Sequence, residues 1–374
     1  MKCPVGQLGG GHGTGPGTMR AVPPPTGEQF VLVDGDQHAV VTEVGATLRA
    51  YGVGTSPVCW GFDEGEIAGG GRGQVLAPWP NRLEDGTYRF GGIEGNAALD
   101  EPARRNAIHG LVRWLPWRLE ARDDASVRLS WVLHPQPAYP FRMRLAVEYS
   151  LGPEGLAVST TATNEGGGPA PFGLGFHPYL APGVAGVEGT FLVLPARRRL
   201  LLDERGLPAG SEAVAGTAWA DLVSLPAGGG GGAVLGRRCL DDCFGDLVTD
   251  DDGRWRVRLL PGERAAGEVV LWADAAFGWL MCFTGDTLPG GDRRRGVAVE
   301  PMTCPPNALR SGEGLLSLDP GQSFSASWGI APAGPEGRRA VGDRQAGARR
   351  RSARRQGPPR FGSRGSPARP APHR

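Results

Sequence analysis

The sequence predicts an all-β fold, a large antiparallel sandwich or barrel. Polar and apolar residues alternate with a period of two along several stretches, and Asp-Gly pairs stand between such stretches. No segment of twelve or more residues repeats its apolar positions with the 3.6-residue period of a helix. The 62 glycines and 34 prolines fit the many turns that such a fold needs.

Four stretches have the pattern of half-buried antiparallel strands. Each places large apolar residues on one face and charged or hydroxyl-bearing residues on the other. They are SVRLSWVL from Ser126, FRMRLAVEY from Phe141, RWRVRLL from Arg254 and SFSASWGI from Ser323. Their spacing predicts one domain from about residue 25 to residue 332, without an internal repeat.

Turns between these stretches are marked by two kinds of signal. Asp-Gly is preferred in tight hairpin turns because both central residues take positive φ. The pairs are Asp34-Gly35, Asp85-Gly86 and Asp252-Gly253, and Pro153-Glu154-Gly155 predicts a further turn.

The two ends of the chain lack the strand pattern. Residues 1–24 are rich in Gly and Pro, and residues 333–374 are rich in Arg, Gly and Pro with almost no large apolar residues. Neither end can bury enough surface to offset its ordering entropy, so we expect both to be disordered. Arginine clusters in the C-terminal tail could contact a nucleic acid or an anionic surface, but a solvated tail is the simpler interpretation. Met19 is an alternative start of the chain.

Charge and composition limit the partners of the protein. The formal net charge is +1, which favours neither a specific nucleic-acid partner nor a membrane partner. The N-terminal segment has no apolar signal-peptide core, and no run approaches the ~20 apolar residues of a membrane helix. We therefore expect a cytoplasmic protein. The six cysteines include no CxxC pair, which favours reduced structural thiols over a disulfide framework.

Five stretches break the strand pattern and place ionisable groups among Pro, Trp, Phe or Gly. Desolvated charges are costly unless they are paired or used, and aromatic rings beside polar groups typically line sugar sites. The stretches and their ionisable residues are APWPNRLEDG with Arg82, NAIHGLVRW with His109, GFHPYL with His177, CLDDCFGDL with Asp241 and Asp242, and VAVEPMTCPPNAL with Glu300. Taken singly, each group also has an ordinary structural interpretation, such as an ion pair, a turn cap or a core histidine.

Three kinds of chemistry fit this set of residues. A His/His/Glu metal site is one, but the spacings are long and include no HxH or HxxxH, so we expect no metal. Glycoside hydrolysis by Asp241 and Glu300 is the second. Acid–base catalysis on a free sugar, with a glutamate base and a histidine acid, is the third and needs no cofactor. No nucleophile elbow is present, and GGGRG at residues 69–73 is only a loop.

The five motifs occur in this order in the aldose 1-epimerase (galactose mutarotase) family, which the chain resembles from about Gln29 to Pro332, its actinobacterial members in particular. The resemblance implies a galactose mutarotase-like β-supersandwich that interconverts the α and β anomers of a free aldose. It further implies that Glu300 is the general base on the C1 hydroxyl. His177 would be the general acid on the ring oxygen, with His109 bonding near that oxygen.

The resemblance also implies substrate contacts. Arg82 and Asp241 correspond to groups that hold sugar hydroxyls, and Asn81 belongs to the same Asn-Arg motif. The family usually has His after the aspartate, where this chain has Asp242, so either aspartate could touch the sugar. The histidine motif also departs from the usual Asn-His-x-Tyr-Phe-Asn, because Phe176 precedes the histidine here.

Several expectations follow for the site. An apolar surround would raise the pKa of Glu300, while a neighbouring carboxylate would keep His177 protonated. We expect the two side chains to face each other across a gap about one pyranose wide.

A related branch of the family acts on hexose 6-phosphates, for which Arg72 and Arg113 are available. A non-catalytic sugar-binding protein of the same fold is a further alternative. The expected partner is a small-molecule sugar, and the expected state is a monomer or homodimer.

Overall fold

The computed structural model describes residues 22–183, 186–223, 233–260 and 267–333. Within these ranges the regular structure is almost entirely β-strand, and the only α-helix is the single turn α1 (Ala308–Ser311). Short 3₁₀ turns lie at Gly69–Gly71, Pro102–Arg104, Val187–Gly189, Ala220–Leu222 and Gly290–Asp292. The prediction of an all-β antiparallel fold is confirmed.

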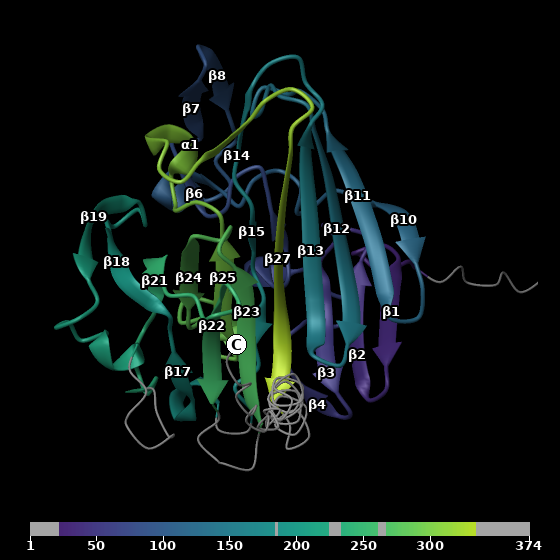
Figure 1. The fold of residues 1–374 in the computed structure, drawn as a ribbon, viewed down its shortest axis with the longest axis vertical. Coiled ribbons are helices and arrows are strands. Elements are labelled where there is room, and N and C mark those ends of the chain that lie inside the picture. The colour runs from purple at the N-terminus through teal and green to yellow at the C-terminus, as the bar shows by residue number, and fades with distance from the viewer. Residues whose placement is uncertain (1–21, 184–185, 224–232, 261–266, 334–374) are drawn as a thin grey trace, which may run out of the picture.

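Two large sheets form the body of the molecule, together with four smaller ones (Figure 1). The nine-stranded sheet has the order β10 (Arg118–Arg122), β11 (Ser126–Leu133), β12 (Met143–Gly152), β13 (Gly155–Asn164), β27 (Ser323–Ala333), β23 (Glu268–Asp274), β22 (Arg254–Leu260), β17 (Phe191–Val193) and β20 (Ala233–Val234). The eight-stranded sheet has the order β19 (Pro208–Ala213), β18 (Ala196–Leu202), β21 (Asp241–Leu247), β24 (Trp279–Phe283), β25 (Val297–Met302), β15 (Gly175–Phe176) and β5 (Val75–Leu76), and β16 (Tyr179–Leu180) also pairs with β25.

The smaller sheets extend this body. One has four strands, β1 (Gln29–Asp34), β2 (Gln37–Thr42), β3 (Leu48–Val53) and β4 (Ser56–Pro57). The others are the pairs β6 (Arg82–Glu84) with β9 (Asn106–Ile108), β7 (Thr87–Phe90) with β8 (Ile93–Asn96), and β14 (Ala170–Phe172) with β26 (Leu316–Leu318). Figure 1 shows the long strands β11, β12, β13 and β27 lying side by side.

The period-two alternation becomes a buried face in each large strand. In β22 every second residue is buried, and the arginines between them are half-buried. Trp255 of this strand and Trp328 of β27 join Phe244 and Leu280 of the eight-stranded sheet in one apolar cluster. The inner faces of both large sheets therefore contribute to a common core, as in a β-sandwich.

Phe176 ties the histidine motif to this core. Its ring lies 5.1 Å from the Trp328 ring and 6.2 Å from the Phe277 ring, measured between centroids, and its side chain is buried. Because aromatic packing of this kind holds a side chain in one orientation, the backbone at the next residue, His177, is also held in place. The departure from the family motif at this position thus serves the core.

The Asp-Gly pairs all lie in turns, but only one of these turns joins two strands that pair with each other. Asp85 and Gly86 both have positive φ, at 51° and 66°, but the flanking strands β6 and β7 belong to different sheets and form no hairpin. In the hairpin between β1 and β2 the loop is shifted by one residue, since Asp34 pairs with Gln37 and only Gly35 has positive φ.

At Asp252-Gly253 only the glycine has positive φ, and the flanking strands β21 and β22 belong to different sheets. The prediction of a tight hairpin is therefore confirmed at Asp34-Gly35, with the loop shifted by one residue, and is wrong at Asp85-Gly86 and Asp252-Gly253. The pairing partners of the strands, which are distant in sequence, decide the geometry of the turn. The turn at Pro153-Glu154 is confirmed, because Gly152 pairs with Gly155 across it.

Strand structure begins at Gln29 and ends at Ala333, close to the limits expected for the domain. Most of the two ends expected to be disordered, residues 1–21 and 334–374, lies outside the described residues, and their disorder stays a prediction. The five described cysteines are free thiols, four of them buried. No helix in the described ranges is long and apolar enough to cross a membrane.

Candidate active site

Glu300 and His177 are brought together by strand pairing. Glu300 lies in the middle of β25, a strand whose six residues are all buried. Strands β15 and β16 both pair with β25, and His177 lies in the short segment between them. As a result His177 Nε2 lies 3.3 Å from Glu300 Oε1. The two groups face each other as expected, but they are in contact, so the expected sugar-wide gap between them is wrong.

A glycine-rich loop packs against the His177 ring. The ring stacks on Tyr179, with 5.0 Å between centroids and 19° between planes, and the Tyr179 hydroxyl donates to the carbonyl of Gly70 at 2.9 Å. At Gly71, where φ is 77°, a Cβ atom would lie only 2.6 Å from His177 Cδ2. The segment 69–73 is a loop, as predicted, but the sequence did not reveal that it forms a wall of the site.

Two polar atoms of this pair have no partner. His177 Nδ1 and Glu300 Oε2 are buried and make no hydrogen bond within the described part of the chain. Most buried polar atoms in proteins are hydrogen-bonded, because an unsatisfied one costs the free energy of its lost hydration. These two atoms are therefore available to the polar groups of a bound ligand.

Burial decides the protonation of the pair. It lowers the pKa of His177 to about 3, and the guanidinium of Arg113 adds to the shift. Burial also raises the pKa of Glu300 well above its usual range; Asp241 adds to this shift and Arg82 opposes it. The expected rise in the pKa of Glu300 agrees with this direction. The expectation that a neighbouring carboxylate keeps His177 protonated does not hold in the free protein. Burial disfavours the imidazolium, and the same burial favours the uncharged form of Glu300, the nearest carboxyl group.

The apolar surroundings of Glu300 come from its own sheet. Cys243 pairs with Met281, and Met281 pairs with Glu300, so the three side chains lie in one row on the same face. Cys243 and Met281 are buried and form a small cluster with Trp279 and other apolar residues. This sulfur-rich row removes water from the carboxylate.

His109 lies edge-on to His177, with 5.3 Å between ring centroids and 77° between planes. It follows β9, which pairs with the strand β6 that begins at Arg82. The backbone N–H of Asn81 donates to His109 Nδ1 at 3.3 Å, so the neutral ring carries its proton on Nε2. Burial lowers the pKa of His109 well below its usual value, and His177, Arg113 and Arg82 add to the shift.

Asn81 and His109 also share an uncommon backbone conformation. Their φ angles are 54° and 65°, in the left-handed region that residues other than glycine seldom adopt. A cluster of such residues is typical of sites where function requires a particular geometry. Asn81 Oδ1 accepts a hydrogen bond from the backbone N–H of Arg82 at 2.9 Å.

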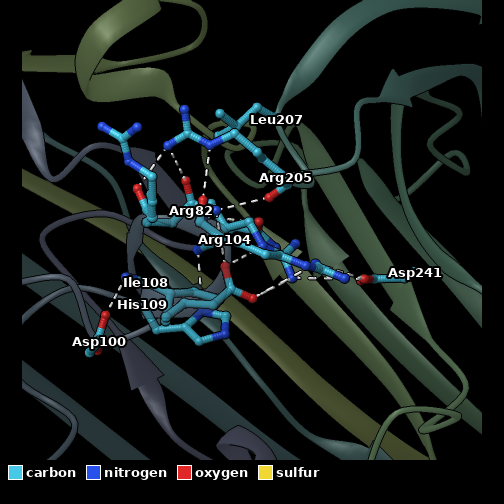
Figure 2. A network of polar contacts seen from close by, with 12 residues as sticks. Arg82, Asp100, Arg104, Ile108, His109, Arg205, Leu207 and Asp241 are labelled. Atoms are coloured by element: carbon cyan, nitrogen blue, oxygen red, sulfur yellow. Dashed lines mark hydrogen bonds and ion pairs between the residues drawn. The ribbon is translucent and has the colours of Figure 1, made fainter.

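Arg82 is held by a residue that the sequence did not single out (Figure 2). Its Nε and Nη2 atoms donate to the two carboxylate oxygens of Glu101 at 2.9 and 3.1 Å. Its Nη2 atom also lies 3.8 Å from Asp241 Oδ2. Arg104, likewise missed, lies 3.8 Å from the same Asp241 oxygen. The run DEPARRN contains both residues, but a charged run of this kind is usually a solvated loop, so no local signal marked it.

The two adjacent aspartates face opposite sides of β21. Asp241 lies beside Arg82, and its side chain is 40% exposed. Asp242 is 9% exposed and forms an ion pair with Arg199, whose Nη2 atom lies 2.5 Å from its Oδ1. Since successive strand residues point to opposite faces, only Asp241 shares a face with Glu300.

The two arginines considered for a phosphate group already have partners. Arg72 Nη2 lies 3.3 Å from Asp292 Oδ2, and the guanidinium also donates to two backbone carbonyls and covers the Trp60 ring. Arg113 Nη2 lies 2.5 Å from Asp100 Oδ2. Among the residues that the structure describes, no three His, Cys, Asp or Glu side chains converge as metal ligands.

The double-sheet fold is that of a galactose mutarotase-like protein. Residues 28–330 match the model of the aldose 1-epimerase family, so the chain belongs to that family, as the sequence motifs predicted. Among curated proteins, the uncharacterized protein YihR of Escherichia coli K12 is 32% identical over 298 residues, which cover 79% of this chain and 91% of YihR.

Solved structures share the fold. The GalM/aldose epimerase homologue from Caenorhabditis elegans superposes with a TM-score of 0.70 at 17% identity, covering 82% of this chain and 99% of that one. The galactose 1-epimerase from Lactobacillus acidophilus gives a TM-score of 0.64 at 20% identity, covering 81% and 93%. At such identities the similarity establishes the fold and no more.

Proposed function

We propose that this protein is an aldose 1-epimerase that interconverts the α and β anomers of a free, glucose- or galactose-like aldose. Family membership supports the reaction class. The single observation that carries the assignment of residues is the 3.3 Å contact between His177 Nε2 and Glu300 Oε1, each with a second polar atom left unpartnered. A relative bearing the name galactose 1-epimerase shares the fold, which supports an aldose as the substrate.

The chemistry needs one proton removed and one proton supplied. The C1 hydroxyl oxygen and the ring oxygen of a cyclic aldose are bonded to the same carbon, so one contacting acid–base pair can reach both. Glu300 takes the proton of the C1 hydroxyl while His177 protonates the ring oxygen, and the C1–ring oxygen bond breaks to give the open-chain aldehyde. Rotation about C1–C2 and closure on the other face, with the roles reversed, gives the second anomer.

The resting protonation state is compatible with this scheme. Burial favours a neutral histidine and a protonated glutamate in the free protein. Transfer of that proton across the contact gives the carboxylate and imidazolium that the mechanism requires, without exchange with solvent. One proton thus serves the pair in both directions, and an acid and a base each typically contribute ~10²–10⁴-fold to the rate.

The other predicted residues take supporting roles in this proposal. His109 directs its Nε2–H toward the ring oxygen, and Arg82 with Asp241 binds sugar hydroxyls. Asn81 orients His109 and Arg82 through the two hydrogen bonds described above. Asp242 keeps its ion pair with Arg199, so we assign the sugar contact to Asp241. The carboxylate partners of Arg72 and Arg113 favour an aldose without a phosphate group.

Anomer exchange measured by proton NMR tests the function. Freshly dissolved α-glucose, α-galactose, α-xylose and glucose 6-phosphate would be followed with and without the protein, and Glu300→Gln would serve as the control. We expect the protein to speed exchange of at least one unphosphorylated aldose, and we expect the variant to leave the uncatalysed rate unchanged. Sugar binding without exchange would instead identify a non-catalytic binding protein, and release of aryl groups from aryl glycosides would identify a hydrolase. The cytoplasmic location and the monomeric or dimeric state stay predictions.

A further inference from the structure

Four charged side chains, those of Arg82, Glu101, Arg104 and Asp241, form a closed ring of alternating sign, and Figure 2 labels its two arginines and Asp241. Asp241 and Arg82 lie close enough to Glu300 to shift its pKa. Arg82 contacts Glu101 at 2.9 Å, and Arg104 contacts Glu101 at 3.7 Å. Both guanidiniums also lie 3.8 Å from the same oxygen of Asp241. The formal charges in this ring cancel, so it presents donors and acceptors without a net charge.

The half of the ring made by Glu101 and Arg82 is rigid. Besides the two bonds from Arg82, Glu101 Oε2 accepts a hydrogen bond from Asn106 Nδ2 at 3.0 Å. The backbone N–H groups of Glu101 and Asn106 each donate to the carbonyl of the other residue. Gly206 covers the Arg82 guanidinium so closely that a Cβ there would lie 2.7 Å from Nη1. Arg82 therefore has little freedom to adapt to a ligand.

The half made by Arg104 and Asp241 is open. The Arg104 side chain is 34% exposed and that of Asp241 is 40% exposed. Their contacts of 3.7 and 3.8 Å are too long for hydrogen bonds, so the guanidinium and the carboxylate keep unused donors and acceptors. The backbone of Arg104 is nevertheless anchored, because its carbonyl accepts a hydrogen bond from Arg205 Nε at 2.9 Å.

We propose that Arg104 is a substrate-contacting residue that shares a sugar hydroxyl with Asp241. The hydroxyl accepts a hydrogen bond from Arg104 and donates one to Asp241, which satisfies both groups. Glu101 acts as a positioning residue, because it holds the two guanidiniums on either side of Asp241. This inference rests on the proposed function for the identity of the ligand, a neutral polyhydroxy compound.

A purely structural role would give a different result. Exposed ion pairs at such distances contribute little to stability, so loss of Arg104 should leave the melting temperature almost unchanged. The neighbouring Arg105 offers a matched control. Its side chain is 73% exposed and contacts Asp85, which is not a member of the ring, at 3.3 Å.

The test compares Arg104→Gln and Arg104→Lys with Arg105→Gln. Two readouts are needed: kcat and KM for anomer exchange of α-glucose and α-galactose, and direct calorimetric binding of 1,5-anhydroglucitol, a glucose analogue without a C1 hydroxyl. We expect Arg104→Gln to raise KM and to weaken analogue binding about tenfold, because one charge-assisted hydrogen bond is lost. The value of kcat should change less than about twofold. Arg104→Lys should recover part of the loss, and Arg105→Gln should match the wild type.

The outcomes separate this inference from the proposed function. If Arg104→Gln matches Arg105→Gln in KM and in analogue binding, the inference is overturned whether or not the protein catalyses exchange. A wild type that binds the analogue but does not speed exchange, while Arg104→Gln binds about tenfold more weakly, would overturn the proposed function and support the role of Arg104. Arg104→Gln could also lower the melting temperature so far that unfolded protein in the assay accounts for all of the lost binding. That result would assign Arg104 to stability and overturn the inference.

Discussion

His177 Nε2 lies 3.3 Å from Glu300 Oε1, and the two side chains are only 6% and 3% exposed. Such a pair is costly to bury, because burial removes the hydration of two ionisable groups, and the site favours the neutral form of each. The site therefore lowers the free energy of unfolding of the protein, and the pH dependence of unfolding should reveal this effect.

Replacing Glu300 with Gln should abolish the catalysed part of anomer exchange and stabilise the protein at alkaline pH. The folded-state pKa of Glu300 is raised, so its contribution to stability is complete below its ordinary pKa and is lost as pH rises toward the folded value. The loss in unfolding free energy should reach about 1.4 kcal/mol per pH unit in that window. Because Gln cannot titrate, urea unfolding at pH 5, 7 and 9 should show a shallower decline for the variant. Parallel curves would contradict the raised pKa.

Replacing His177 with Gln should act on the acid side. The pKa of His177 falls from 6.5 in the unfolded chain to about 3 in the folded one, so its contribution is present above 6.5 and is lost as pH falls toward 3. The variant should lose less stability than the wild type between these values. His134, which is exposed on the surface, provides the control. If His134→Gln flattens the acid limb as much as His177→Gln does, the assignment to His177 is wrong.

Asp241→Asn and Asp242→Asn should separate substrate binding from stability. Asp241 lies in the half-exposed ring with Arg82, so its variant should raise KM about tenfold and leave the melting temperature nearly unchanged. Asp242 is buried against Arg199, so its variant should lose about 1–3 kcal/mol of stability and keep a normal KM. The measurements are steady-state exchange kinetics and thermal unfolding. If instead Asp242→Asn raises KM and Asp241→Asn loses stability, the sugar contact belongs to Asp242.

Gly71→Ala should lower kcat by displacing the His177 ring. The new Cβ would lie 2.6 Å from His177 Cδ2 and 2.9 Å from Nε2, well inside normal contact distance. Gly216 is the matched control, because it has a similarly positive φ of 82° and no atom near the position of a Cβ. Both variants should carry the same backbone strain of order 1 kcal/mol, but only Gly71→Ala should lose activity. Equal activity in the two would show that the loop does not position His177.

Much of the fold could be predicted from local patterns. The alternation in RWRVRLL and FRMRLAVEY appears as strands β22 and β12, because the side-chain period of a strand is set by its backbone geometry. The Asp-Gly turns could be located but not described, since their geometry depends on strand pairings that two residues cannot encode.

Part of the candidate site could be predicted from the sequence. Motifs marked Glu300 and His177, and these two residues do meet. Glu101 and Arg104 gave no signal, because their importance arises from Arg82 and Asp241, which lie far from them in the chain and close to them in space. The GGGRG loop was likewise unremarkable until the ring of His177 was found against Gly71.

The sequence by itself determined the class of fold and which residue types are available for acid–base chemistry, since alternation and motif order are properties of neighbouring residues. Only the tertiary structure decided which side chains touch, which aspartate faces the pair, and where the proton of the pair resides. Those properties depend on distance and on the exclusion of water, and both are set by strands that meet from distant parts of the chain.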